Sequence, residues 1–186
     1  MTGELPLEEL VGYFDEARVP HMVVGSFASS EHGVPRATRD LDVILEIDLR
    51  GLHALLGQLD DETYYVPRGA AEDAVADQGQ FNIVDMRSGW KIDLIVRKRR
   101  AFSESEFSRR QPTSIEGVQT WVASPEDTVL SKLEWSKLSG SERQLIDVAG
   151  VLAARGDAID DEYLDRWAPE LGVVDLLAQT REMAAG

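Results

Sequence analysis

The sequence predicts an α/β fold of the α+β kind, in which helices flank a mixed β-sheet and a helical region follows it. The first observation is that short apolar runs of strand length alternate with amphipathic stretches through the first two thirds of the 186 residues. The second is a hairpin signal, in which residues 81–84 and 91–96 flank the turn Arg87-Ser88-Gly89. The third is that only helical periodicity remains after Ser124. We therefore expect an α/β core over 1–123 and helices packed on it over 124–186.

The elements before the hairpin follow from periodicity and turn chemistry. Apolar residues at helical spacing predict a helix over 5–17, which Val19-Pro20 ends. A first strand is expected over 21–24, and Ser26 is a good N-cap for a short helix at 27–31. The sequence then predicts a strand over 40–47, a leucine-rich amphipathic helix over 49–59 and a short helix over 70–76.

The elements after the hairpin are mostly helical. A helix is expected over 102–110, and one or two short strands, broken near Gly117, over 115–122. Ser124-Pro125-Glu126-Asp127 is a strong helix start, with Ser124 as N-cap and Asp127 closing a capping box. This helix should end at Ser139-Gly140. Three more are predicted over 142–155, 160–167 and 173–183.

The composition excludes several classes of protein. The net charge of −15 repels nucleic acids, so general DNA binding is not expected. A basic island at 97–100, followed by Arg109-Arg110, is better explained as a solvated loop than as a phosphate-binding patch. The chain has no cysteine, which rules out disulfides and thiolate metal sites. The chain has no apolar run of about 20 residues, so we expect no membrane span. Its N-terminal segment is acidic where a signal peptide would be basic, so we expect a cytoplasmic protein.

Residues 23–45 carry the main chemical signal. Gly25-Ser26 follows a short apolar run and suits a turn where the backbone approaches a ligand. Asp40 and Asp42 are two apart in a strand, so their side chains lie on one face. Neighbouring carboxylates repel each other unless a cation lies between them, and Mg²⁺ prefers carboxylate and phosphate oxygens.

Asp93 in the second hairpin strand is a third candidate ligand. If that strand lies beside the Asp40–Asp42 strand, Asp93 completes a cluster able to hold two divalent ions about 4 Å apart. The simpler alternative is an exposed Asp93 paired with Lys91 on its own strand. A lone Asp-x-Asp is a weak signal, whereas its combination with Gly-Ser and a later strand aspartate favours the cluster.

This combination resembles the signature of the nucleotidyltransferase superfamily with the DNA polymerase β-type fold. The segment HGVPRATRDLDV is similar to that of the minimal nucleotidyltransferases and the AbiEii-type toxin nucleotidyltransferases. Those families carry a lysine on a helix after the core and an aspartate on the next helix, and Lys132 and Asp147 match them. The resemblance covers roughly residues 20–155 and implies a nucleotidyltransferase-like sheet.

The resemblance also implies roles for individual residues. Gly25 and Ser26 would contact nucleotide phosphates, and Asp40 and Asp42 would bind Mg²⁺ or Mn²⁺. Asp93 would be a third metal ligand or the base that deprotonates the acceptor hydroxyl. Lys132 would neutralise phosphate charge, and Asp147 would orient Lys132 or the nucleotide.

Each role has a plainer alternative. Lys132 suits a solvated helix face equally well, and Arg143 and Asp147 have the spacing of a surface ion pair. Arg36 could hold phosphate, as could Arg39, which could instead balance the acidic strand. His32 is better explained as a loop residue than as a base. The four tryptophans are most simply core or interface anchors: Trp90, Trp121, Trp135 and Trp167.

The expected function is Mg²⁺-dependent transfer of a nucleoside monophosphate from a nucleoside triphosphate to an acceptor hydroxyl. The acceptor could be a tRNA end, a protein side chain or a small molecule, and the acidic surface disfavours a large RNA. The alternative is a non-catalytic protein of this fold that binds a nucleotide or a partner, such as a cognate antitoxin. A Mg²⁺-dependent hydrolase is a third possibility, which the Gly-Ser element disfavours.

Overall fold

The computed structural model describes residues 5–186, which form two compact units. The first unit contains residues 5–24 together with Thr38–Val122. The second contains Gly25–Ala37 together with Ala123–Gly186. The segment Gly25–Ala37 thus belongs to the same unit as the helices that follow the sheet. The local sequence pattern does not predict this grouping.

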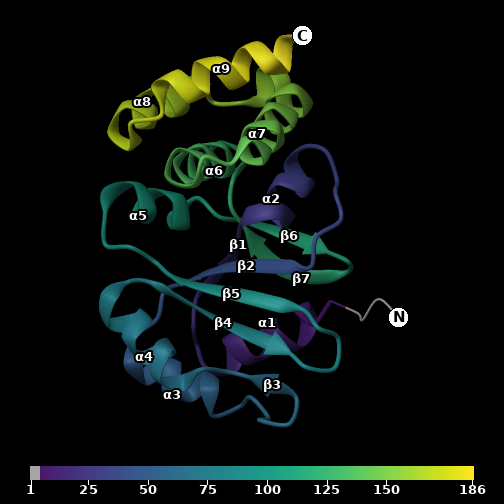
Figure 1. The fold of residues 1–186 in the computed structure, drawn as a ribbon, viewed down its shortest axis with the longest axis vertical. Coiled ribbons are helices and arrows are strands. Elements are labelled where there is room, and N and C mark those ends of the chain that lie inside the picture. Colours follow the sequence, from purple (N-terminus) through teal and green to yellow (C-terminus); the bar gives the residue numbers. More distant parts are fainter. Residues whose placement is uncertain (1–4) are drawn as a thin grey trace. The chain divides into compact units, whose positions relative to one another are not determined.

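The first unit is built on a mixed sheet with the strand order β3-β4-β5-β2-β1-β7-β6 (Figure 1). The pairs β2–β5 and β1–β7 are parallel, and the other neighbours are antiparallel. The mixed sheet with flanking helices confirms the predicted fold class. The strands are β1 (His21–Val23), β2 (Asp40–Leu45), β3 (Tyr64–Tyr65), β4 (Gln80–Asp85), β5 (Lys91–Val96), β6 (Gln111–Ile115) and β7 (Val118–Val122).

Alternating burial gives the central strands two different faces. The core face is buried, and the residues on the other face, called the open face below, are exposed or half-buried. Leu41, Val43 and Leu45 of β2 are buried, while Asp40 is exposed and Asp42 only partly covered. The same alternation runs along β5. Complete burial of each such aliphatic side chain stabilises the fold by about 1.5–3 kcal/mol. The polar members of both strands are thereby held on the opposite face.

Three helices of the first unit pack with one another and with the sheet. They are α1 (Leu7–Glu16), α3 (Leu49–Leu56) and α4 (Arg68–Asp77). Helix α1 packs against α3 and β7, α3 against α4, and α4 against β4. Helix α5 (Ala101–Ser108) follows β5 and buries Phe102 and Phe107.

Two strands differ from the sequence prediction. Strand β6 begins at Gln111, earlier than expected, and its antiparallel partner β7 follows a two-residue turn. In that turn Glu116 and Gly117 both have positive φ, 49° and 88°, the conformation of a type I′ hairpin. The two-residue strand β3 was not predicted, because so short a pairing leaves no periodic signal.

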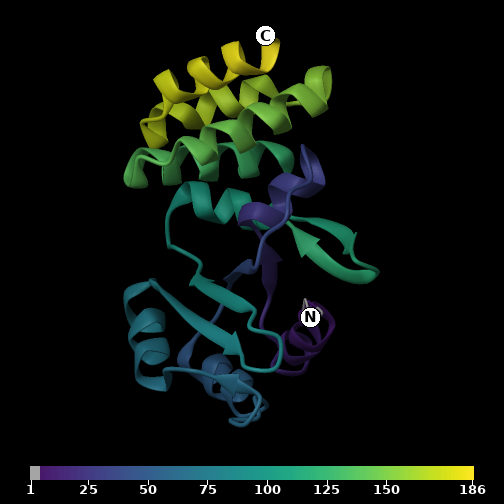
Figure 2. The same ribbon diagram turned by 45° about the vertical axis from the view of Figure 1, so that its right-hand side comes forward.

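The second unit is helical. Helix α7 packs against α6 and α9, α8 against α6 and α9, and α2 against α6 and α7. Figure 2 shows the helices after residue 123 as stacked green-to-yellow ribbons. Their bounds are α2 (Gly25–His32), α6 (Pro125–Ser139), α7 (Glu142–Arg155), α8 (Asp161–Leu171) and α9 (Val174–Ala185), with a 3₁₀ turn at Gly156–Ala158.

The start of α6 is held by side-chain caps, as its sequence predicts. Ser124 Oγ accepts a hydrogen bond from the Asp127 amide at 3.2 Å, and the Ser124 hydroxyl donates to Asp127 Oδ2 at 2.6 Å. Asp127 Oδ1 also accepts from the Tyr163 hydroxyl at 2.7 Å, which anchors α8 to α6. Gly140, at φ 70°, ends α6 in the left-handed conformation.

None of the helices in residues 5–186 has both the length and the apolar character that crossing a membrane requires.

Candidate functional site

Two predicted acidic residues stand opposite each other on adjacent strands. Strands β2 and β5 are parallel, and their register pairs Asp42 with Asp93 and Asp40 with Lys91. Neighbouring strands lie about 4.8 Å apart, so residues paired on one face are close together. The side chain of Asp93 is 16% exposed, and Asp40 is exposed. The first unit thus brings Asp40, Asp42 and Asp93 onto one open face of its sheet.

Lys91 lies among these carboxylates. Its Nζ donates a hydrogen bond to Asp93 Oδ2 at 2.8 Å, and its side chain is 43% exposed. The hydrogen bond to Asp93 raises the pKa of Lys91, and the negative charges of Asp40 and Asp42 act in the same direction. The Lys91–Asp93 pair anticipated as the simpler alternative is therefore present, alongside the pairing of Asp93 with Asp42.

The donor chemistry of this face fits a hard divalent cation. Asp42 and Asp93 offer carboxylate oxygens from paired positions, and Asp40 offers another two residues away on β2. Within residues 5–186 no group of three His, Asp or Glu side chains is already drawn together as a metal site. One oxygen of Asp93 is instead bound to the Lys91 ammonium. The residue types suit such a cation, and Lys91 holds one of the candidate ligands.

Asn82 is a further candidate, which the sequence motifs did not indicate. It lies on β4, where the register pairs it with Asp93 on the side opposite Asp42. The row across three strands is therefore Asp42, Asp93 and Asn82. The signal was present in the alternation of β4, in which Phe81 and Ile83 are buried and Asn82 is half-buried. An amide offers one more oxygen ligand or a hydrogen-bond donor for Asp93.

In the second unit the Gly-Ser pair opens a helix. Gly25 has φ 63°, a left-handed conformation that favours glycine, and α2 begins there rather than after Ser26 as predicted. The Ser26 hydroxyl accepts a hydrogen bond from Arg36 Nη2. Ser26 is therefore held by a cation within its own unit.

Lys132 and Asp147 form a buried ion pair. Lys132 Nζ lies 2.7 Å from Asp147 Oδ2 and 2.9 Å from Gln144 Oε1. The side chains of Lys132 and Asp147 are 6% and 9% exposed, which rules out the solvated helix face considered for Lys132. Lys132 comes from α6, and Gln144 and Asp147 from the adjacent helix α7.

Arg36 extends this pair into a longer polar network. Its Nε lies 3.4 Å from Asp147 Oδ1, an ion-pair distance. Nε of Arg36 is also buried, and it has no hydrogen-bond partner among the described residues. The Arg36 side chain is 26% exposed, so it is the more accessible of the two cations around Asp147. Two cations and one carboxylate leave an excess of positive charge, which suits phosphate oxygens.

His32 has a structural role. Its Nε2 lies 2.6 Å from the Ala123 carbonyl, and its Nδ1 lies 2.8 Å from Arg155 Nη2. Because a carbonyl only accepts and a guanidinium only donates, Nε2 carries the proton and the ring is neutral. Burial lowers the pKa of His32 accordingly. His32 ends helix α2 instead of lying in a loop, and it ties α2 to Ala123 and α7.

The basic island is largely engaged in local contacts. Arg97 pairs with Glu46 at 2.6 Å, and Arg110 lies over the rings of Phe107 and Trp121 at 4.3 and 5.1 Å. Trp121 and Trp135 are 41% and 52% exposed, so neither is a core residue. Trp167 is buried as expected.

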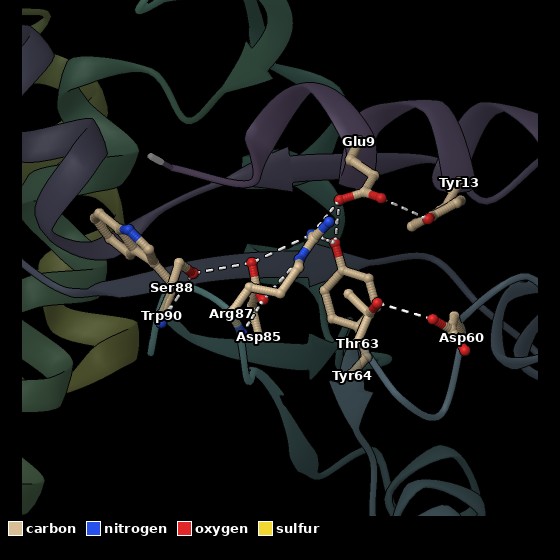
Figure 3. Close-up of polar contacts among 9 residues, drawn as sticks. All are labelled: Glu9, Tyr13, Asp60, Thr63, Tyr64, Asp85, Arg87, Ser88 and Trp90. Atoms are coloured by element: carbon tan, nitrogen blue, oxygen red, sulfur yellow. Dashed lines mark hydrogen bonds and ion pairs between the residues drawn. The ribbon is translucent and has the colours of Figure 1, made fainter. Parts of the chain in front are cut away.

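A separate polar network joins α1 to strands β3 and β4 (Figure 3). The Tyr64 hydroxyl donates to Glu9 Oε2 at 2.6 Å, and Arg87 Nη2 lies 2.6 Å from the same oxygen. Arg87 also bonds Asp85, and its guanidinium lies over the Tyr64 ring at 5.5 Å. The Tyr64 hydrogen bond lowers the pKa of Glu9, and burial raises that of Tyr64. The network fastens the helix to the sheet.

Comparison with protein families identifies the superfamily. A model described as "Nucleotidyltransferase of unknown function (DUF6036)" matches residues 6–165, most of the chain. The chain belongs to this family. The nucleotidyltransferase superfamily inferred from the Gly-Ser and Asp-x-Asp motifs is thereby confirmed. A search of curated proteins found no match.

Solved structures of this nucleotidyltransferase fold are similar over most of their length. The solution structure of the antibiotic-resistance factor ANT(2'')-Ia matches with a TM-score of 0.59 and 11% identity, covering 93% of this chain and 95% of that one. The lincosamide antibiotic adenylyltransferase LnuA, bound to lincomycin, matches with a TM-score of 0.54 and 13% identity, covering 81% and 96%. A nucleotidyltransferase-like protein from Paracoccidioides brasiliensis has a TM-score of 0.51 and 15% identity, covering 78% and 72%. At these identities the likeness concerns the fold alone.

Proposed function

We propose that this protein is a divalent-metal-dependent nucleotidyltransferase. It transfers a nucleoside monophosphate from a nucleoside triphosphate to an acceptor hydroxyl and releases pyrophosphate. The observation that carries the proposal is the parallel pairing of Asp42 with Asp93 beside Asp40 on an open sheet face. Family membership supports the same reaction class.

In this proposal Asp40, Asp42 and Asp93 are the metal ligands. A bound Mg²⁺ would supply charge neutralisation for the triphosphate and for the developing charge on the acceptor oxygen. Asp93 is the best-placed base, because it is partly shielded and adjoins Asp42. A carboxylate there would accept the proton of the acceptor hydroxyl as that oxygen attacks the α-phosphorus.

The second unit has candidate phosphate-binding groups of its own. Ser26 offers a hydroxyl and its backbone N–H, and Arg36 offers a partly exposed guanidinium. Lys132 is buried in its pair with Asp147, so its role is to maintain positive potential and to hold Asp147 in place. Such chemistry requires mainly positioning and charge neutralisation.

The charge of the chain favours a small acceptor. A net charge of −15 repels a polyanion such as tRNA and attracts a cationic or neutral molecule. A similar structure is that of ANT(2'')-Ia in complex with adenylyl-2''-tobramycin, which is an adenylylated small molecule. We therefore place a hydroxyl-bearing small molecule ahead of RNA and protein as the acceptor.

Thermal unfolding with each of four nucleoside triphosphates, with and without Mg²⁺, tests nucleotide binding. A ligand at a hundred times its Kd adds about 2.7 kcal/mol, which for a chain of this size raises Tm by roughly 5–10 °C. The rise should require Mg²⁺ and be absent in Asp42→Asn. The matched control is Asp73→Asn, an exposed aspartate of α4 in the same unit. A rise that persists in Asp42→Asn would contradict the metal assignment.

Transfer itself is tested with α-labelled triphosphates and three classes of acceptor. Hydroxyl-bearing antibiotics such as tobramycin and lincomycin, bulk tRNA and a protein mixture would be compared for label uptake and pyrophosphate release. We expect label on a small molecule and none with Asp42→Asn. Nucleotide binding without pyrophosphate release from any acceptor would favour the non-catalytic binding protein instead.

A further inference from the structure

Lys91 is placed to compete with a metal for the same oxygen. It lies two residues before Asp93 on β5 and opposite Asp40 in the parallel register with β2. Its ammonium donates to Asp93 Oδ2 at 2.8 Å. Asp93 is shielded, at 16% exposure, whereas Lys91 reaches it from a side chain that is 43% exposed.

The charges on this face explain why a cation is there. Asp40, Asp42 and Asp93 bring three negative charges onto two paired strands, and Asn82 on the other side of Asp93 brings none. Like charges at this spacing destabilise the folded chain unless they are compensated. A lysine ammonium is a compact charge on a flexible stem, so it can compensate them and also move away.

We propose that Lys91 is the resident counter-ion of the metal site. Its ammonium holds Asp93 while the site is without metal, and it leaves that oxygen when a divalent cation binds. The inference deepens the proposed function and rests on it, since it requires the aspartates to be metal ligands. Lys91 is a positioning residue here, which keeps the acidic face folded and sets how tightly metal binds.

Two consequences separate this role from a purely structural one. Removing the Lys91 charge should weaken the metal-free fold, because the carboxylate repulsion is no longer compensated. The same change should strengthen metal binding, because the divalent cation no longer displaces a bound charge or feels its repulsion. A unit charge a few ångströms from a divalent ion changes its affinity by about tenfold or more, even at the dielectric constant of water.

The experiment is titration of Mn²⁺ into the full chain without nucleotide, by calorimetry and Mn²⁺ electron paramagnetic resonance. The proteins are wild type, Lys91→Met, Lys91→Gln, Lys91→Arg and Asp42→Asn. We expect Lys91→Met and Lys91→Gln to bind Mn²⁺ about tenfold more tightly than wild type, while Lys91→Arg does not gain. The matched control is Lys98→Met, an exposed lysine just beyond β5, which should match wild type.

Thermal unfolding of the same proteins gives the second readout. Without metal, Lys91→Met and Lys91→Gln should melt below wild type, and saturating Mn²⁺ should raise their Tm by more than it raises that of wild type. Lower stability with unchanged Mn²⁺ affinity would overturn the inference and leave the proposed function standing. If wild type and every variant fail to bind Mn²⁺, the metal assignment and this inference both fall.

Discussion

Asp42 on β2 and Asp93 on β5 occupy paired positions on adjacent parallel strands, although they are far apart in the chain. Each strand alternates between buried aliphatic residues and more exposed ones, and both aspartates fall in the more exposed set, so the pairing places both carboxylates on the same face. Lys91 and Asn82 lie beside them in the same register. The catalytic proposal depends on this relationship.

Replacing Asp93 with Asn should reduce nucleotidyl transfer by at least about a hundredfold, since even outer partners of a metal ligand contribute 10- to 100-fold. Folding should survive, because the change also relieves repulsion with Asp42. Rates of pyrophosphate release and urea unfolding curves measure the two effects. Asp77→Asn, an exposed aspartate at the end of α4, is the control. A fully active Asp93→Asn would remove Asp93 from the site.

Asp147→Asn should destabilise the protein by about 3–5 kcal/mol, the range for breaking a buried ion pair. The change leaves the buried Lys132 ammonium and Arg36 without their shared carboxylate. Urea unfolding measures the loss. Arg143→Gln, an exposed change one turn earlier on α7, should cost less than about 0.5 kcal/mol. If Asp147→Asn and Arg143→Gln lowered the free energy of unfolding equally, Asp147 would belong to a surface ion pair.

Stability should fall as the pH drops below about 6.5, partly because of His32. Burial lowers the pKa of His32 from its ordinary 6.5, so the folded protein keeps this ring neutral while the unfolded chain takes up a proton. The contribution of neutral His32 to the free energy of unfolding is complete above about pH 6.5. It is lost as the pH falls toward the pKa of His32 in the folded protein, at no more than about 1.4 kcal/mol per pH unit. His21, whose pKa burial also lowers, acts with the same sign.

Unfolding free energies at pH 7.5 and pH 5.5 measure this dependence. His32→Gln should flatten the decline relative to wild type, at some cost in stability at neutral pH. His53→Gln is the control, because the His53 side chain is 60% exposed. A decline of the same size in His32→Gln and wild type would assign the pH dependence to other groups.

Tyr64→Phe should destabilise the first unit by about 1.5–3 kcal/mol, the usual contribution of a hydrogen bond to a charged group. The Tyr64 ring is buried, and its hydroxyl donates to Glu9 at 2.6 Å (Figure 3). The adjacent Tyr65→Phe is a matched control, since Tyr65 is 59% exposed. Mn²⁺ affinity should be unchanged in both, and a loss of affinity in Tyr64→Phe would link this network to the acidic face.

Gly33→Ala should destabilise the second unit by about 1–3 kcal/mol, the range for overpacking. A Cβ at Gly33 would lie 2.8 Å from the Val151 amide nitrogen and 3.0 Å from the Gly150 carbonyl carbon, both of which are backbone. Gly69→Ala is the control, since nothing in the described chain lies within 4 Å of a Cβ there. That variant should be as stable as wild type or slightly more so. Urea unfolding compares them.

Local pattern was enough for most of the elements. The alternation in 81–84 and 91–96 with its Gly-containing turn, and the Ser-Pro-Glu-Asp start of α6, predicted what the structure contains. The sequence pattern did not predict the strands that form only by pairing with residues distant in the chain. Strand β3 is two residues long, and the first half of β6 contains Pro112, so neither carries a strand signature of its own.

The candidate site shows the same division. Sequence placed Asp40 with Asp42, and Lys91 with Asp93, on common faces, because side-chain direction repeats every two residues within one strand. It could not choose between Arg143 and Lys132 as the partner of Asp147. In the structure Asp147 lies 2.7 Å from Lys132 on the neighbouring helix. The sequence also did not indicate Asn82, because Asn82 becomes a candidate only through its register with Asp93.

By itself the sequence determined the periodicities, the turns, the excess of acid and the motifs that identify the superfamily, all of which are local or compositional properties. The tertiary structure alone decided which strands are neighbours, and therefore that Asp93 faces Asp42 on one side and Asn82 on the other. It also decided that Lys91 binds Asp93 and that Asp147 is shared by Lys132 and Arg36. The physical reason is that strand order and helix packing are set by burial summed over the whole chain, which no single segment encodes.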